Sequence, residues 1–159
     1  MQVSATLALL IASLTANGLL TGATLDQAVK QLPARKTIGA VAYSTYSRAA
    51  DLANGLVWYP VLGVGSAVLS VVTAGVGLGQ HAAGSQFAAL ITLIIASVAH
   101  MGSTALAAPV NISQRRAVGD EAALTRILDR FARLNAIRAA LLVATVGVNV
   151  WALVATIQA

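Results

Sequence analysis

The fold of this chain is decided by residues 61–98, which read VLGVGSAVLSVVTAGVGLGQHAAGSQFAALITLIIASV. They lie within residues 52–114, a block whose only ionisable side chains besides Tyr59 are two histidines, counted as neutral. A helix of about 20 apolar residues crosses a bilayer, because each residue rises about 1.5 Å through about 30 Å of hydrocarbon. The block is too long for one crossing, and the glycines and polar residues from Gly77 to Gln86 predict a turn between two antiparallel helices.

Two further uncharged stretches flank this block, at residues 1–25 and 139–159. Each is long enough for one crossing, so the sequence predicts four membrane spans, at about residues 3–24, 56–76, 87–108 and 139–157. Of the 159 residues, 58% are hydrophobic and 9% are charged, with a mean hydropathy of +0.81, which excludes a soluble monomeric domain. The expected fold class is all-α: an integral membrane four-helix bundle, formed as one domain by residues 1–159, with cytoplasmic helical extensions.

The basic residues predict the orientation of the bundle. All ten lysines and arginines lie between spans one and two or between spans three and four. Cytoplasmic loops carry an excess of such residues, so both connections are expected in the cytoplasm and both termini on the other side. The expected location is the bacterial inner membrane. Because Met1 and Gln2 offer no basic region of a signal peptide, the first span is expected to be retained.

Helices are expected to extend beyond the membrane on the cytoplasmic side. Asp120 and Glu121 are typical of a helix start, and an apolar stripe follows at helical spacing before span four. The stripe consists of Leu124, Ile127, Leu128 and Phe131. Residues 38–53 supply its expected partners, which are Val41, Tyr46 and Ala49. The same segment leads into span two, where a kink is expected at Pro60.

The opposite face of the helix before span four is charged. It carries Arg126, Asp129, Arg130 and Arg133. This face is expected in water or near anionic lipid headgroups.

Glycines recur four residues apart at Gly18 and Gly22, and again at Gly75 and Gly79. Pairs of this kind let two helices approach closely. They fit either packing within the bundle or an interface between copies of the chain, so a homo-oligomer or a larger membrane complex stays open.

Few polar groups lie at membrane depth, and these are the candidates for chemistry because a buried polar group without a partner is costly. His100, the only histidine within a span, is the catalytic candidate. The substrate-binding candidates are Asn17, Tyr59, Asn111, Asn135 and Arg138. Counting helical turns indicates that such groups can meet in one inner-leaflet pocket. The alternative is that Asn17 and His100 join helices by hydrogen bonds while Arg138 extends to lipid phosphate.

Several function classes are disfavoured. No glutamate lies within a span, which argues against a proton-coupled small multidrug transporter. His81 and His100 lie too far apart for bis-histidine haem, and no cluster of His, Asp and Glu has the spacing of metal ligands. No metal and no cofactor are therefore expected. Membrane lipid is an expected partner, whereas nucleic acid is not, because membrane orientation already explains the basic residues.

Short motifs along nearly the whole chain point to a known family. The first half contains GLLTGA at residues 18–23 and QLPAR at residues 31–35, and the second half contains APVNI at residues 108–112 and RILDRFARLNAIR at residues 126–138. With these motifs the chain resembles the anthrone-oxygenase-like family of small four-helix membrane proteins, many of them of unknown function. Phe131 and Asn135 stand where related members often carry tryptophan and histidine.

The resemblance implies an oxygenase that uses O₂ to convert an activated aromatic methylene, as in an anthrone, to a quinone carbonyl. Such a reaction needs a base, for which His100 is the candidate, and donors to the developing oxyanion. The candidate donors are Asn17, Asn111 and Asn135, with Arg138 as electrostatic stabiliser. The ligand would be a hydrophobic aromatic or quinone. A second class stays open, namely a non-catalytic membrane subunit or a scaffold that binds lipid or quinone.

Overall fold

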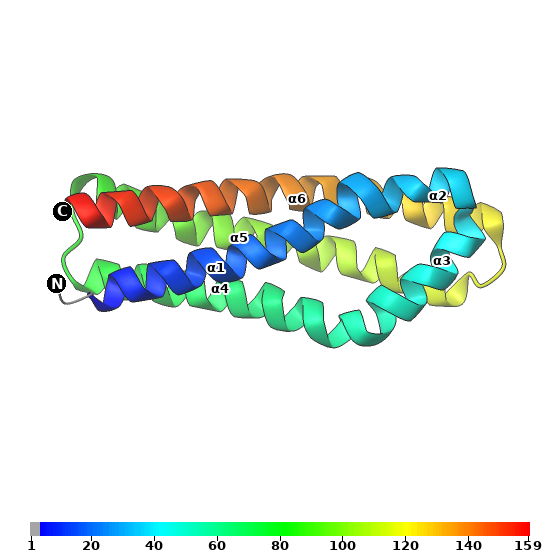
Figure 1. Cartoon of the computed structure of the whole chain (residues 1–159), viewed down its shortest axis with the longest axis horizontal. Helices are drawn as coiled ribbons and strands as arrows, with labels where there is room; N and C mark the ends of the chain where they lie inside the picture. The colour runs from blue at the N-terminus through cyan, green and yellow to red at the C-terminus, as the bar shows by residue number, and fades with distance from the viewer. Residues whose placement is uncertain (1–3) are drawn as a thin grey trace.

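The computed structural model describes residues 4–159, which form helices joined by short connections (Figure 1). In chain order these are α1 (Ala5–Asp26), η1 (Gln27–Gln31), α2 (Leu32–Ile38), α3 (Ala40–Ala49), η2 (Ala50–Asn54), α4 (Gly55–Gly79), α5 (Gly84–Ile112), η3 (Ser113–Arg116) and α6 (Glu121–Gln158). The segments η1 and η2 are widened π-helical turns, and η3 is a 3₁₀ turn. No strand occurs in this part of the chain.

These elements combine into four long rods. Within residues 4–159, four helical stretches are long and apolar enough to cross a membrane, namely Ala5–Ile38, Ala40–Gly79, Gly84–Arg116 and Glu121–Gln158. The predicted all-α four-helix membrane bundle is therefore confirmed. Val3, at the predicted start of the first span, lies outside the described residues, as do Met1 and Gln2, on which the expectation about a signal peptide rests.

The rods lie side by side and antiparallel. Ser13 of α1 approaches Ser70 of α4 and donates a hydrogen bond to Asn149 of α6, each at 2.9 Å. At the same end as the described start of the chain, Trp151 of α6 donates to Ser85 of α5. The start of α1 and the C-terminal end of α6 therefore lie at one end of the bundle, opposite α2 and α3 (Figure 1).

The first rod is longer than the sequence predicts, because the chain stays helical beyond α1 through η1 and α2. Pro33 permits this continuation, since it lies in the first turn of α2, where its missing N–H costs little. Gly39 then ends the rod with φ +87°, a conformation that favours glycine, and α3 starts a new direction.

The extensions pack against each other as the sequence predicts, but through other partners. Asp120 caps α6 by accepting a hydrogen bond from the Ala123 N–H, and three of the four stripe residues are buried. They share a core with Leu32, Ala40, Tyr43 and Ala107. The predicted partners Val41, Tyr46 and Ala49 are wrong, because all three side chains are exposed, Val41 by 38% and Tyr46 by 49%. The new helix after Gly39 turns Ala40 and Tyr43 inward instead.

The second rod changes direction between α3 and α4, at the widened turn η2 (Figure 1). Pro60, where the sequence predicts a kink, lies further along inside α4. The bend and the start of α4 form one wall of the cavity described below.

The glycine that packs within the bundle is not one of the predicted pairs. A Cβ atom on Gly77 would lie 2.6 Å from Leu90 Cδ1 of α5 and 3.2 Å from Thr6 Cγ2 of α1. At the predicted positions a Cβ would meet nothing within 4 Å, and these are Gly18, Gly22, Gly75 and Gly79. Packing of those pairs within the bundle is therefore contradicted, whereas an interface between copies stays a prediction.

Candidate functional site

A cavity of about 180 Å³ lies among the four rods, towards the end that carries the extensions. Its wall is largely apolar and includes residues such as Leu20 of α1, Pro60 of α4, Met101 of α5 and Leu142 of α6. The cavity thus joins all four membrane-crossing rods, and residues that are distant in sequence meet there.

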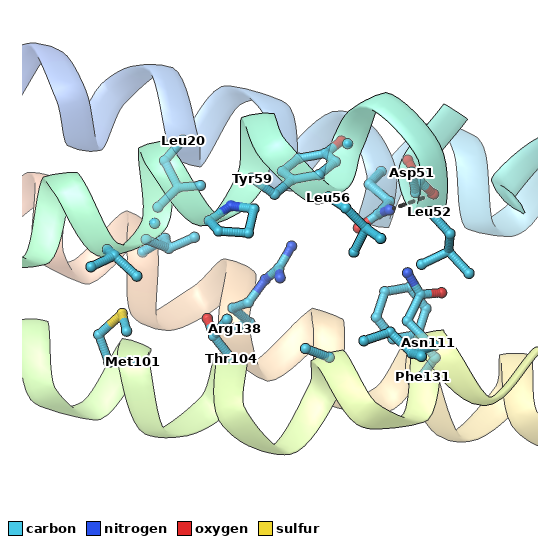
Figure 2. Close-up of a pocket in the computed structure, with 18 residues that line it drawn as sticks. Leu20, Asp51, Leu52, Leu56, Tyr59, Met101, Thr104, Asn111, Phe131 and Arg138 are labelled. Carbon is cyan, nitrogen blue, oxygen red and sulfur yellow. Dashed lines mark hydrogen bonds between the residues drawn. The ribbon is translucent and has the colours of Figure 1, made fainter. Parts of the chain in front are cut away.

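The cavity opens sideways between α4 and α5. Leu56 and Val64 of α4 and Ile112 of α5 line it and are also exposed on the surface of the bundle, by 41%, 49% and 39%. Figure 2 shows the space between these two helices, with the side chains of both directed into it. The cavity is therefore bordered by residues that also face the outside of the bundle.

Arg138 brings a guanidinium group into this apolar space. It comes from α6, and in Figure 2 its side chain extends between Tyr59 and Thr104. Its Nη2 lies 3.4 Å from Thr24 Oγ1, while its buried Nε has no hydrogen-bond partner among the described residues. No carboxylate within residues 4–159 forms a salt bridge with it. Arginine keeps its charge in proteins, so this cation lacks a direct counter-charge.

Asp51 supplies a carboxylate to the same cavity. It lies in η2 and is only 7% exposed. One of its oxygens, Oδ2, accepts hydrogen bonds from Gln27 Nε2 at 3.1 Å and from Ser47 Oγ at 2.9 Å. The other oxygen, Oδ1, receives no hydrogen bond from the described residues, which leaves it free to accept a proton or a donor group.

Sequence reasoning missed Asp51. It stands just before the uncharged block and reads as an acid of a solvated connection. The available signal was Ser47, four residues earlier and therefore on the same helical face. The helical turn η2 and the partner Gln27 on another rod were needed to bring the carboxylate inside.

Three predicted site residues line the cavity together: Tyr59, Asn111 and Arg138. Asn111 is itself engaged, since its Oδ1 and its carbonyl oxygen accept hydrogen bonds from Gln114 Nε2. Tyr59 adds an aromatic ring to the wall of the cavity that Arg138 enters (Figure 2).

Asn17 does not line the cavity but belongs to a hydrogen-bonded layer nearer the other end of the bundle. Its amide donates to Ser70 Oγ and to the Ser13 carbonyl, each at 2.9 Å. Ser13 in turn donates to Asn149 Oδ1 at 2.9 Å. These contacts join α1, α4 and α6, in agreement with the structural interpretation of Asn17.

His100 and Asn135 are fully buried and stand outside the cavity wall. Neither nitrogen of the His100 ring, nor either side-chain polar atom of Asn135, forms a well-aligned hydrogen bond with a described residue. The residue after His100, Met101, does line the cavity. The described residues contain no group of three or more His, Cys, Asp or Glu side chains that could hold a metal ion.

Fold and site together define a helical membrane protein with a laterally open, mainly apolar cavity that holds one carboxylate and one guanidinium. Comparison with known proteins adds no family, because no family model, no curated protein and no solved structure matches this chain.

Proposed function

We propose that this protein takes up a small, flat, hydrophobic molecule that carries a negatively charged or strongly polarised oxygen, and binds it in the cavity between α4 and α5. The observation that carries the proposal is Arg138, a guanidinium in an apolar cavity without a direct counter-charge. Burying a charge is costly unless it is paired, so a ligand oxygen at this position would gain a strong, charge-assisted hydrogen bond. Aromatic ketones, phenolates and quinones have this chemistry.

The shape of the cavity supports a ligand that enters from lipid. Pockets for drug-sized molecules hold about 300–1,000 Å³, whereas this cavity holds about 180 Å³. A ligand of two or three fused rings would therefore leave part of its surface in the opening, against Leu56 and Val64. Tyr59 would stack against or flank the rings, because aromatic faces pack well on flat apolar surfaces.

We further propose oxidation by O₂, the reaction that the resemblance to anthrone oxygenases implies. A base removes one proton from the activated methylene, and the oxygen of the resulting enolate is stabilised by Arg138. The carbanion passes an electron to O₂, and the two radicals combine to a peroxide anion. This anion takes the proton back from the base to form a hydroperoxide, and loss of water leaves the carbonyl. The balance is one methylene and one O₂ giving one carbonyl and one water.

Asp51 is the better candidate for the base than His100. It lines the cavity, and one of its carboxylate oxygens accepts no hydrogen bond from the described residues, whereas His100 does not line the cavity. The role of His100 stays a prediction from the sequence, which the Asp51 assignment replaces in this mechanism.

The test measures binding and turnover separately. The full-length protein in lipid nanodiscs is titrated with a hydroxyanthrone, followed by fluorescence, and oxygen uptake is recorded with an electrode. Arg138→Gln should weaken binding at least tenfold, and Asp51→Asn should lower turnover by about 10²–10⁴ while largely retaining binding. The control is Arg133→Gln, which changes an exposed arginine on the same helix.

Equal binding by wild type and Arg138→Gln would contradict the proposed site. Binding that depends on Arg138 without any oxygen uptake would contradict the oxygenase reaction and favour the ligand-binding scaffold instead.

A further inference from the structure

A second hollow lies on another face of the bundle, between α5 and α6 near the extensions. It is a groove of about 480 Å³ and shares no lining residue with the cavity of Arg138. Its main lining residues are Leu106, Pro109, Val110, Arg126, Ile127 and Arg130. The proposed function makes no use of this groove.

Two arginines stand over the groove with no acid to neutralise them. Arg126 and Arg130 are one helical turn apart on the same face of α6, and both are exposed. Among the described residues neither forms a salt bridge. The nearby Asp129 is already paired, since its Oδ1 lies 2.7 Å from Arg35 Nη2. Two like charges at this spacing repel each other, so a bound anion would stabilise the pair.

Apart from Ser113, the remainder of the groove is apolar. Leu106 is 66% exposed, and Val110 and Ile127 are half-buried. Because α5 and α6 are antiparallel, the Leu106 end of the groove lies towards the membrane centre and the Arg126 end towards the cytoplasmic side. The groove therefore offers positive charge at one end and an apolar surface at the other.

On α5 the uncharged stretch continues through Gln114, past the groove, whereas on α6 it ends at Arg138, eight residues or about 12 Å from Arg130. One wall of the groove is therefore still uncharged where the other already carries arginines, as expected near the surface of a membrane. An arginine side chain extends towards lipid phosphate from such a position.

We propose that this groove binds one anionic phospholipid, whose phosphate accepts hydrogen bonds from Arg126 and Arg130 and whose acyl chain covers Leu106 and Pro109. Arginine suits this task because its planar guanidinium donates two parallel hydrogen bonds to a phosphate. The apolar end of the groove selects a lipid over a free phosphate ion, and the unpaired charges select an anionic lipid over a zwitterionic one.

The test uses full-length protein in mild detergent, with native mass spectrometry to count retained lipids. The probes are phosphatidylglycerol, phosphatidylcholine and inorganic phosphate. Wild type should retain one phosphatidylglycerol in preference to phosphatidylcholine. The double variant Arg126→Gln/Arg130→Gln should lose about tenfold or more in affinity, since each basic residue near the surface contributes about a factor of five. The control Arg133→Gln removes a charge outside the groove and should retain the lipid.

A competition on the wild-type protein makes the result independent of any variant. A fluorescent phosphatidylglycerol analogue should be displaced by unlabelled phosphatidylglycerol and not by phosphatidylcholine or millimolar inorganic phosphate. Displacement by phosphate would replace the lipid site with a free-anion site. Displacement by phosphatidylcholine, or equal loss of lipid in the Arg133→Gln control, would overturn the proposal. None of these outcomes depends on Arg138, so they are separate from the test of the proposed function.

Discussion

Gly77 is the position where the bundle should tolerate a side chain least. It lies on α4 where that helix meets both α1 and α5, and an added Cβ would come within 2.6 Å of Leu90 Cδ1. Non-bonded carbon atoms prefer a separation of about 3.5–4.0 Å, so Leu90 would have to move by about 1 Å. Leu90 has no exposed surface and packs in a core with Leu10 and Leu93.

In Gly77→Ala the overpacked contact with Leu90 should cost about 1–3 kcal/mol of the free energy of unfolding. In a helix interior, alanine otherwise stabilises by about 1 kcal/mol relative to glycine. Gly75 supplies the matched control, because a Cβ there meets nothing within 4 Å. Gly75→Ala should therefore be neutral or stabilising, and the two alanine variants should differ by more than 1 kcal/mol.

The assay is reversible unfolding in mixed micelles, followed by circular dichroism, together with a double-mutant cycle. In a Leu90→Ala background the clash is gone, so Gly77→Ala should cost little there, which gives a coupling energy of about 0.5–3 kcal/mol. Equal stabilities of Gly77→Ala and Gly75→Ala, or additive effects in the cycle, would refute the packing of α4 on α5 at this point.

Two further predictions concern the polar layer and the topology. Asn149→Leu removes the acceptor of the Ser13 hydroxyl and should lower the free energy of unfolding by about 0.6–2 kcal/mol. The control Thr92→Val alters an exposed hydroxyl that is bonded only within α5, and it should change the free energy of unfolding by less than about 0.5 kcal/mol. Unfolding in micelles measures both variants. A membrane-impermeant thiol reagent on whole cells should label Ser85→Cys and spare Arg116→Cys, and the reverse pattern would invert the predicted orientation.

The four-helix architecture could be predicted from the sequence because the bilayer imposes it. Without water in the hydrocarbon, each uncharged stretch of about 20 residues must form a helix, so the positions of charged residues fix the number of rods. The length of each rod and the positions of its bends were less predictable. The passage of the first rod through Pro33 depends on the proline falling within a first helical turn, directly after the π-helical turn η1.

The sequence also did not predict which face of each helix packs against its neighbours. In a membrane helix apolar residues cover all sides, so the sequence does not mark which glycine faces a neighbour. Gly75 and Gly79 have the spacing of a packing motif, but the packed residue lies between them. The inward position of Asp51 was unpredictable in a similar way, because it depends on the π-helical turn η2, which no sequence pattern indicated.

Arg138 remains the residue whose position most requires a functional explanation. Among the described residues His100 and Asn135 are buried without a well-formed side-chain hydrogen bond, yet asparagine is neutral and histidine can be neutral, so each costs at most a few kcal/mol. Arginine cannot shed its proton in proteins, and a charge in the interior of a membrane protein is a functional candidate by default. A purely structural arginine at this depth would be expected to contact a carboxylate, but Asp51 instead accepts its hydrogen bonds from Gln27 and Ser47. The cation and the carboxylate thus line one cavity without forming a salt bridge, and the proposed function assigns both groups to one ligand.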